Sequence, residues 1–386
     1  FRDQGVGWTT TPPLIDLIHD IVGRPSLKQL QGFMGMSIEE STIPWDLDRP
    51  MTAEEVEETF MYCEHDVDST CEVLTLRKDY VSNRTMLCEL NDVDPLTELK
   101  HPNARVASDI LGAEWEEYDN EPYVLPDAID VDNIPDVVME FVNNLDRDLG
   151  RMKKSEVEEA GLKGFPTFDF HGMGVGFGVG GIHGAIGYTQ VKQSKGKDVV
   201  IKVSTPYQER ATDTRAIFLQ DIGSYYPSLI IGYDYMSRSV LPEAKQMFKD
   251  FYDLRMEAKA DGDTATADAC KLILNTVYGA MKSKYNALAD SMQATNVCVS
   301  GQLFIIDLLH RIVTAADSVK LIQANTDGWM YSIDREQIPL VDAVVEQWKV
   351  ETGFSVSTDE IEVVWQRDVN SYIALFKDGE IHAKGA

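Results

Sequence analysis

The stretch AIFLQDIGSYYPSLIIGYDY covers residues 216–235 and decides how the rest of the chain is interpreted. Its first five residues, AIFLQ, are mostly apolar and predict a buried strand. A carboxylate, Asp221, follows this strand directly. Burying an unpaired charge costs several kcal/mol. Either Asp221 therefore reaches solvent in a turn, or a positively charged partner lies against it.

A second carboxylate, Asp327, occupies a comparable place. Residues 318–334 read SVKLIQANTDGWMYSID, in which NTDG is typical of a turn between two β-prone runs. Two carboxylates at the ends of adjacent strands can share divalent cations, and two metal ions about 4 Å apart promote in-line phosphoryl displacement. A bound metal would then be the positive partner of Asp221. The alternative is that both aspartates are solvated turn residues.

Two predicted helices, over residues 242–262 and 265–286, lie between the carboxylates in the sequence. On the second helix, four side chains recur at i, i+4, i+7 and i+11 and so line one face: Lys271, Asn275, Tyr278 and Lys282. On the first, Arg255 and Lys259 form an i, i+4 pair. Such cations would bind a triphosphate, and the tyrosine would stack on a base. The alternative is a charged, solvated helix face.

The remaining elements mix helices and strands without a regular βαβ rhythm. A capping box, Thr52 to Glu55, begins a long helix. Residues 92–135 are acidic and contain several prolines, which predicts a connecting region with short elements. A Gly-rich stretch covers residues 171–187, and an amphipathic helix covers about 290–315. This order predicts an α+β fold.

The composition limits the classes of protein that the chain can represent. The chain has 386 residues, which by length suggests two or three domains, and a net charge of −29. Residues 1–150 hold 10 basic and 33 acidic side chains, whereas residues 151–386 hold 25 and 31, so a local basic groove remains compatible with the later part. The five cysteines form no CxxC pair, which fits reduced thiols. We expect no membrane span and no secretory signal, and the missing initiator Met predicts a fragment.

Three of these segments together resemble the motifs of family B DNA polymerases. DIGSYYPSLI resembles the first palm motif (D-x-x-S-L-Y-P-S-I), KLILNTVYGA the fingers motif (K-x-x-x-N-S-x-Y-G), and ANTDGWMYSI stands in the place of the second palm motif (D-T-D-S). They occur in the order of the family. FGVGGIHGA resembles the Gly-Gly segment between the exonuclease and polymerase domains of phage-type members, and YCEHDVDST resembles the third exonuclease motif, Y-x-x-x-D.

The resemblance implies an α+β fold with a right-hand palm. The palm would contain an antiparallel sheet and be joined to helical fingers, after the C-terminal part of a ribonuclease H-like exonuclease domain. It implies five segments: residues 1–90, the exonuclease remnant; 91–165, an acidic connecting region; 166–241, the first part of the palm; 242–288, the fingers; and 289–386, the second part of the palm, with the thumb absent.

The resemblance also implies roles for individual residues. Asp221 and Asp327 would be catalytic and hold two Mg²⁺ ions, with Mn²⁺ as an alternative, together with the main chain of Ile222. The main chain around Ile222, Gly223, Ser224 and Tyr225 would hold the triphosphate. The rest of the nucleotide site would come from the side chains of Tyr226, Arg255, Lys259, Lys271, Asn275 and Tyr278. Among these, Tyr226 would exclude a 2′-hydroxyl. DNA contacts would come from Gly180, Gly181, Gly279 and Tyr372, and the exonuclease remnant would contain Tyr62 and Asp66.

The sequence departs from the family pattern at several positions. Asn325 replaces the first acid of D-T-D, Gly328 replaces the usual Ser, and Asn370 stands where the Lys of a Lys-x-Tyr primer-binding motif is common. The retained Asp327 matches the acid that binds both metals, so we expect catalysis to survive. The D-x-E triplets at 119–121 and 334–336 lie downstream of Tyr62, out of order for proofreading. We therefore expect no exonuclease activity from this chain.

These observations predict a DNA-directed DNA polymerase that acts on primed template DNA and dNTPs. Phage replication proteins would be further partners, no membrane would be involved, and the location would be cytoplasmic, in the host cytoplasm if the chain is phage-encoded. One alternative, favoured by Asn325 and the acidity, is an inactive polymerase-like module that binds nucleic acid. Another, a metal-dependent nuclease, would need a complete carboxylate cluster in the first 150 residues.

Three remaining patterns are interpreted as structural. GFGVGG (176–181) fits G-x-G-x-x-G, but no helix is predicted after it, so a dinucleotide-binding fold is not expected. His171 and His183 have no acid or Cys at metal-ligand spacing and are expected to be ordinary structural histidines. Four tryptophans are expected in the core: Trp8, Trp45, Trp115 and Trp348.

Overall fold

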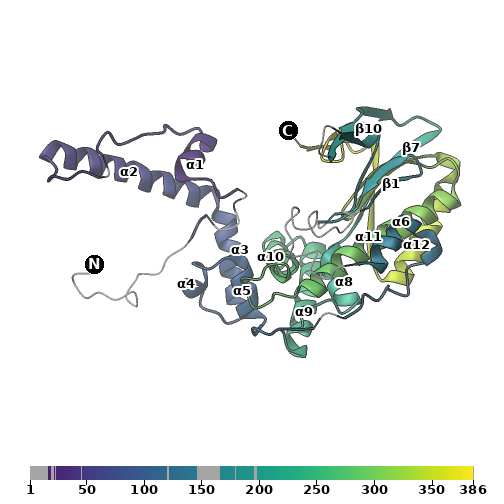
Figure 1. Cartoon of the computed structure of the whole chain (residues 1–386), viewed down its shortest axis with the longest axis horizontal. Coiled ribbons are helices and arrows are strands. Elements are labelled where there is room, and N and C mark those ends of the chain that lie inside the picture. The colour runs from purple at the N-terminus through teal and green to yellow at the C-terminus, as the bar shows by residue number, and fades with distance from the viewer. Residues whose placement is uncertain are drawn as a thin grey trace. The chain divides into compact units, whose positions relative to one another are not determined.

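The computed structural model describes the chain except for residues 1–15, 19–20, 22, 45, 120, 146–165, 179, 195–197 and 386, and it describes residues 188–194 and 198–204 by their backbone alone. The chain divides into two compact units, each of which combines two segments (Figure 1). The first unit contains Phe1–Glu114 and Leu241–Val277, and the second contains Trp115–Val240 and Tyr278–Ala386. Each unit is described by itself below.

In the part of the first unit that the structure describes, every regular element is a helix. These helices are α1 (Leu27–Met34), α2 (Ala53–Leu76), α3 (Lys78–Glu89), α4 (Pro95–Glu98), α5 (Asn103–Ile110), α9 (Pro242–Asp261) and α10 (Thr264–Met281), whose last turn belongs to the second unit. The capping box predicted at Thr52 and Glu55 is present in both directions at the start of α2. Buried Gln31 of α1 donates a hydrogen bond to Ser69 Oγ of α2 (2.8 Å) and so fixes one helix on the other.

The second unit combines helices with one large antiparallel sheet. The order of its strands is β1-β2-β3-β8-β9-β7-β10-β11-β12, and β6 pairs with β10 (Figure 1). The bounds of the first seven strands are β1 (Thr167–Phe170), β2 (Met173–Gly176), β3 (His183–Ile186), β4 (Tyr188–Ser194), β5 (Asp198–Ser204), β6 (Tyr207–Arg210) and β7 (Arg215–Ile222). The others are β8 (Lys320–Asn325), β9 (Gly328–Asp334), β10 (Val356–Asp368), β11 (Ser371–Phe376) and β12 (Ile381–Lys384).

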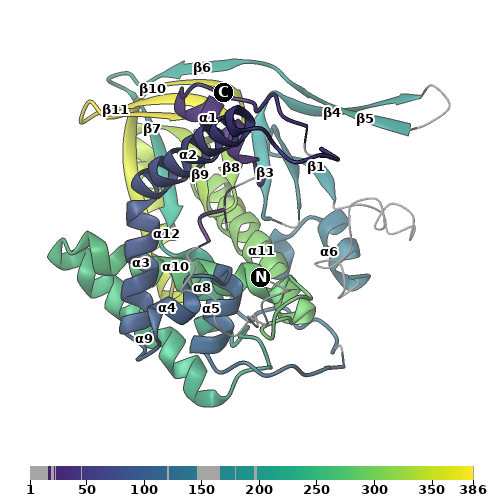
Figure 2. The same ribbon diagram turned by 90° about the vertical axis from the view of Figure 1, so that its left-hand side faces the viewer.

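Strands β4 and β5 form a separate two-stranded hairpin, which Figure 2 shows extending away from the rest of the sheet. Six helical elements lie in the described part of this unit: η3 (Val131–Asn133), α6 (Asp136–Asn143), α8 (Tyr225–Gly232), α11 (Ser291–Ala315), η4 (Arg335–Gln337) and α12 (Ile338–Thr352). The β-rich continuation after the Gly-rich stretch agrees with the prediction that no dinucleotide-binding helix opens there.

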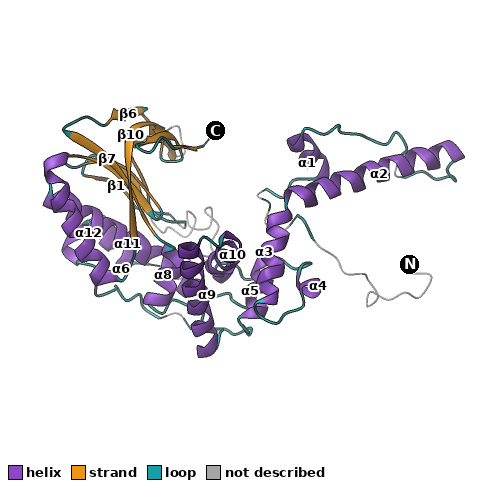
Figure 3. Ribbon diagram, turned by 180° about the vertical axis from the view of Figure 1, so that it is seen from behind, coloured by secondary structure: helices purple, strands orange, loops and turns teal. Residues whose placement is uncertain are grey.

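Helices α11 and α12 cover one face of the sheet (Figure 3). Their contact is filled by aromatic rings, in which Trp348 of α12 packs within 5.4 Å of Phe354 and 6.3 Å of Phe304, measured between ring centroids. Helix α11 is also long and apolar enough to cross a membrane, a feature that the sequence analysis overlooked. However, 78% of its most apolar window is buried inside the protein, as expected for a core helix.

The opposite face of the sheet carries a second apolar cluster. Its buried members come from five strands of the sheet: Ile217, Leu219, Ile322, Met330, Ile361, Val364, Ala374 and Phe376. Strand β7 therefore lies between two apolar layers, which explains why its sequence is apolar at successive positions rather than alternating.

The α+β prediction is confirmed at the level of helices combined with an antiparallel sheet. The strand, turn and helix predicted from residue 216 onward are present as β7 and α8, whereas the helix predicted over 265–286 ends at Met281. One of the core predictions is wrong, because Trp115 is 62% exposed in the segment that begins the second unit. Trp348 is fully buried as predicted, and Trp8 and Trp45 lie outside the described residues. The five-segment division and the ribonuclease H-like remnant stay predictions.

Candidate active site

The two aspartates singled out in the sequence lie at neighbouring strand ends. Strands β7 and β9 are adjacent, with Asp221 opposite Gly328, and Asp327 occupies the two-residue turn between β8 and β9. The backbone N–H of Ile222 donates a hydrogen bond to the Asp327 carbonyl (2.8 Å). The structure therefore brings together two carboxylates that are far apart in the sequence.

The surroundings of these carboxylates disfavour their negative charge. Burial raises the pKa of Asp221 to about 6, and the charges of Asp327 and Asp359 add to this rise. Burial also raises the pKa of Asp327. The positive charge of Lys384 lowers the pKa of each aspartate but does not cancel the rise that burial causes. A divalent cation bound between the two carboxylates would remove this repulsion.

The donors at this point suit Mg²⁺. They are two carboxylates, to which the main-chain carbonyl of Ile222, one residue after Asp221, would add a further oxygen. Within the described residues there is no group of three or more His, Cys, Asp or Glu side chains that could hold a metal. Mg²⁺ is commonly bound by one or two carboxylates together with substrate phosphates and water, so a complete protein cage is not required.

Strained backbone flanks both carboxylates. Ser224 (φ 51°), the N-cap of α8, lies three residues after Asp221, and Thr326 (φ 48°) precedes Asp327 in its turn. Positive φ is costly for a β-branched residue such as threonine, by roughly 1–3 kcal/mol. The Thr326 N–H donates to the Ile182 carbonyl (2.8 Å), which helps to hold the strained turn in place.

A segment of the Gly-rich stretch supports this turn. Gly181 has φ 129°, and a Cβ there would lie 3.0 Å from the Thr326 Cα, so glycine is required for the close approach. The segment is in turn held by α11: the Gly178 N–H donates to Gln302 Oε1 (2.8 Å), and Cys298 Sγ donates to the Gly178 carbonyl (3.2 Å). Gln302 and Cys298 are buried residues that sequence reasoning missed, because their pattern is that of an ordinary core helix.

Two of the predicted nucleotide-binding tyrosines meet beside the same segment. The ring centroids of Tyr226 and Tyr278 are 4.3 Å apart, and the Tyr226 hydroxyl donates to the Gly180 carbonyl (2.5 Å). Lys282 Nζ lies 4.4 Å from the centre of the Tyr278 ring, and burial lowers the pKa of this lysine. Tyr278 is therefore buried in the second unit rather than displayed on an open helix face.

Gln302→Leu is expected to loosen the Gly-rich segment. Leucine cannot accept the Gly178 hydrogen bond, and leaving a buried N–H unsatisfied costs about 1–3 kcal/mol. Amide hydrogen exchange at Gly178 and Gly181 should become at least about tenfold faster, as that cost implies. Gln347→Leu on the exposed side of α12 is the matched control and should leave these amides unchanged. Unchanged protection in Gln302→Leu would show that the segment is held by other contacts.

Four of the predicted nucleotide-binding residues belong to the first unit: Arg255, Lys259, Lys271 and Asn275. Lys271 and Asn275 are exposed on α10 and line a groove of about 340 Å³ together with Tyr80 and Asn83 of α3. On α9, Lys259 is exposed, and the charge of Arg255 acts on the Cys270 thiol of α10, whose pKa is raised mainly by burial. Gly279, a predicted DNA contact, lies on the exposed side of α10, and nothing lies within 4 Å of the position its Cβ would take.

Tyr225 has a structural side chain. Its hydroxyl donates to the Gly301 carbonyl of α11 (2.6 Å), and its ring packs edge-on against Phe354. Any nucleotide contact at this position must therefore come from the main chain, as the sequence analysis expected. The Ser224 side chain makes no capping hydrogen bond at the start of α8.

The predicted exonuclease residues share one face of α2, directed toward α1. Lys28 Nζ lies 5.5 Å from the centre of the Tyr62 ring, and Gln31 Nε2 lies 3.5 Å from Asp66 Oδ1. The i, i+4 placement of this pair is therefore as predicted.

Tyr372, the predicted primer contact, packs against the second apolar cluster from strand β11. The two residues before β11, Val369 and Asn370, form the turn that follows β10, where the Asn370 N–H donates to Asp368 Oδ1 (2.9 Å). His171 lies 5.5 Å from His310, between ring centroids, and the His183 ring contacts the Gly181 carbonyl.

Asp221→Asn is expected to stabilise the metal-free protein at neutral pH. Because the folded-state pKa of Asp221 is raised from 3.8 to about 6, ionisation opposes folding, and stability falls as the pH rises from about 4 to about 6. Asn avoids this cost. Asp221 is half-buried and screened, so we expect a gain of about 1–2 kcal/mol above pH 6.

Urea unfolding in EDTA at pH 4 and pH 7.5 measures this difference, with Trp329 and Trp348 as buried fluorophores of the same unit. The gain should shrink toward zero at pH 4. Asp213→Asn in the exposed turn before β7 is the control. An equal gain at both pH values would mean that the effect does not come from the charge of Asp221.

Comparison with known proteins finds a structural likeness but no match in sequence. No family model matches the chain, and no curated protein matches it. Among solved structures, it is similar to the family B DNA polymerase from the hyperthermophilic archaeon Pyrobaculum calidifontis, with 13% sequence identity and a TM-score of 0.42. The match covers 94% of this chain and 43% of that chain. At this level the likeness assigns no residue and no activity.

Proposed function

We propose that the chain is a DNA-directed DNA polymerase of the phage-type family B, containing palm and fingers and the end of an exonuclease domain. The observation that carries this proposal is the meeting of Asp221 and Asp327 at adjacent strand ends. The palm and fingers motifs of the sequence supply the rest of the argument, because they occur together and in order.

The chemistry would be transfer of a deoxynucleotide to the 3′-hydroxyl of a primer, with release of pyrophosphate. Two Mg²⁺ ions, or Mn²⁺, held by Asp221, Asp327 and the main chain of Ile222 would activate the hydroxyl and neutralise the charge that develops on the phosphates. The Ser224 side chain does not cap the first backbone N–H groups of α8, and these groups would bind the triphosphate.

The residues of the fingers would complete the nucleotide site. Arg255, Lys259 and Lys271 would neutralise the triphosphate, and Asn275 would line the nascent base pair. These four residues belong to the first unit and the two carboxylates to the second. We propose that both sets act on the same nucleotide.

Tyr226 would select deoxynucleotides by occupying the space of a 2′-hydroxyl. Its hydrogen bond to Gly180 and its contact with Tyr278 hold the ring in one position, which a steric filter requires. Gly180, Gly181, Gly279 and Tyr372 would contact DNA.

We propose no proofreading by this chain. Tyr62 and Asp66 would be the remnant of an exonuclease site. Phage replication proteins would be partners, and the protein would act in the cytoplasm, that of the host if a phage encodes it.

The test is incorporation of a labelled dNTP on a primed DNA template with Mg²⁺, compared with the matching rNTP and with EDTA. We expect template-directed incorporation that requires Mg²⁺ and strongly prefers the dNTP. Folded protein that binds neither primed DNA nor dNTP with Mg²⁺ would overturn the proposal. Binding of primed DNA without dNTP binding or incorporation would instead favour the inactive polymerase-like module, which the replacement at Asn325 also favours.

A further inference from the structure

Lys282 is the one member of the predicted helix face, with Lys271, Asn275 and Tyr278, that the proposed function leaves without a role. It follows Met281, the last residue of α10, and it is half-buried. Its Nζ lies 4.4 Å from the centre of the Tyr278 ring, and burial lowers its pKa. Because these surroundings disfavour the charge of the lysine, the negative face of an aromatic ring is a valuable neighbour. The contact with Tyr278 therefore stabilises the cation.

Tyr278 is in turn packed against the tyrosine that would select the sugar. The centroids of the Tyr278 and Tyr226 rings are 4.3 Å apart, and the ring planes are inclined by 42°. Tyr278 is 7% exposed, whereas Tyr226 is half-buried and so remains partly open to a bound nucleotide. These two tyrosines and Lys282 all belong to the second unit. Tyr278 therefore supports the Tyr226 ring, and Lys282 contacts the supporting ring.

The hydroxyl ends of both rings are held by hydrogen bonds. The Tyr226 hydroxyl donates to the Gly180 carbonyl (2.5 Å). Burial is the main cause of the raised pKa of the Tyr278 phenol, and hydrogen bonds with Cys298 and Tyr226 add to the rise. A hydrogen bond at the hydroxyl does not prevent a phenol ring from tilting about its long axis. The ring faces must therefore be held by packing, and Lys282 is one of the contacts of the Tyr278 ring.

We propose that Lys282 is a positioning residue for sugar selection: its cation holds the Tyr278 ring against Tyr226, and so keeps Tyr226 where it would exclude a 2′-hydroxyl. This inference rests on the proposed polymerase function. It makes discrimination against ribonucleotides depend on a residue outside the fingers motif, because KLILNTVYGA ends at Ala280. Without the cation the Tyr278 ring would tilt, and Tyr226 would move aside to admit a ribonucleotide.

The test is single-turnover incorporation of dNTP and of the matching rNTP on primed DNA with Mg²⁺. Lys282→Met keeps an unbranched side chain but removes the charge. It should lower the preference for dNTP over rNTP about five- to thirtyfold, the factor that a partly desolvated cation–π contact supports. Lys282→Arg should restore most of the preference, because arginine also stacks on aromatic faces as a cation.

The direction of the change separates positioning from structural damage. A filter that has loosened accepts rNTP faster, whereas a damaged site slows the incorporation of both nucleotides. We therefore expect faster rNTP incorporation by Lys282→Met, with dNTP incorporation close to that of the wild type. Slower incorporation of both nucleotides with an unchanged preference would assign Lys282 to the fold alone and overturn the inference.

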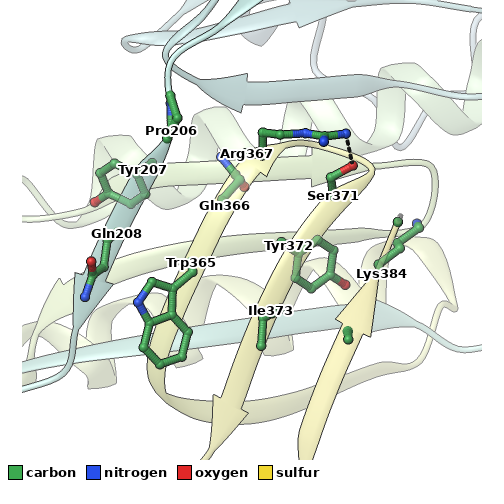
Figure 4. A pocket seen from close by; sticks show the side chains of 12 residues that line it. Pro206, Tyr207, Gln208, Trp365, Gln366, Arg367, Ser371, Tyr372, Ile373 and Lys384 are labelled. Atoms are coloured by element: carbon green, nitrogen blue, oxygen red, sulfur yellow. Dashed lines mark hydrogen bonds between the residues drawn. The ribbon is translucent and has the colours of Figure 1, made fainter.

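Lys320→Met is the matched control. Lys320 Nζ lies 4.5 Å from the centre of the Tyr207 ring, and Lys320 begins β8, whereas Asp327 follows the other end of that strand. Figure 4 shows Tyr207 on β6, among the residues that line a groove. Removing this cation should leave the preference for dNTP unchanged. An equal loss in both variants would mean that the contact with Tyr278 is not the cause.

A double variant tests whether Lys282 acts through Tyr226. Tyr226→Ala removes the proposed filter and should by itself abolish most of the preference for dNTP. Adding Lys282→Met to Tyr226→Ala should then change the preference no further, because no filter remains to be positioned. A further loss of the same size in that background would show that Lys282 acts by another route, and would overturn the inference.

The outcomes distinguish this inference from the proposed function. If the wild type incorporates dNTP with a strong preference and Lys282→Met keeps that preference, the inference fails and the polymerase proposal stands. If the wild type incorporates dNTP and rNTP equally well, Tyr226 is not a filter, and the inference again fails alone. If folded wild-type protein incorporates neither nucleotide, the inference falls together with the polymerase proposal.

Discussion

Asp327→Asn is expected to reduce template-directed dNTP incorporation by at least about a thousandfold. The change is nearly isosteric but removes one of the two charges that would hold Mg²⁺. The turn itself should survive, because it is fixed by main-chain contacts, including the hydrogen bond from Ile222 N–H to the Asp327 carbonyl. The measurement is single-turnover incorporation on primed DNA, together with Mg²⁺ titration.

Asp213→Asn is the control for this change, since it removes the same charge from an exposed turn of the same unit. It should retain nearly full activity. Asp327→Asn protein that incorporates dNTP at a similar rate would remove Asp327 from the catalytic site and leave the paired aspartates as turn residues.

Gly328→Ala is expected to lower the incorporation rate by about ten- to a hundredfold, the penalty of a displacement of roughly 1 Å at a reacting centre. A Cβ at this position would lie 2.1 Å from Asp221 Oδ1 and 3.2 Å from the Gln220 carbonyl, so the Asp221 carboxylate must turn away. Gly328→Ser, which introduces the residue usual in the D-T-D-S motif, should be equally impaired, because the obstacle is the Cβ and not the hydroxyl.

The control for Gly328→Ala is Gly232→Ala at the end of α8, where nothing lies within 4 Å of the added Cβ. It should match the wild type. Full activity in Gly328→Ser would mean that Asp221 reaches its working position by another rotamer, and the close approach to Gly328 would then have no catalytic meaning.

Local sequence patterns predicted several elements of the fold, including those that position Asp221 and Asp327. The apolar run before Asp221, the turn chemistry around Asp327 and the capping box at Thr52 depend on residues a few positions apart, and each was found where expected. Periodicity placed Lys271 and Asn275 on one exposed side of α10. The prediction for Trp115 was wrong, because size and aromaticity alone do not indicate whether a neighbouring element covers a side chain.

The sequence by itself determined the type and order of the elements, the two candidate carboxylates and the resemblance of the motifs, because these depend on local spacing. The tertiary structure alone decided which side chains meet. Strand register joins Gln366, Tyr372 and Lys384 in one row, the approach of β7 to β9 requires glycine at 328, and the packing of α11 directs Gln302 to Gly178. These contacts bring together residues that are distant in the chain, and no local pattern encodes such pairings.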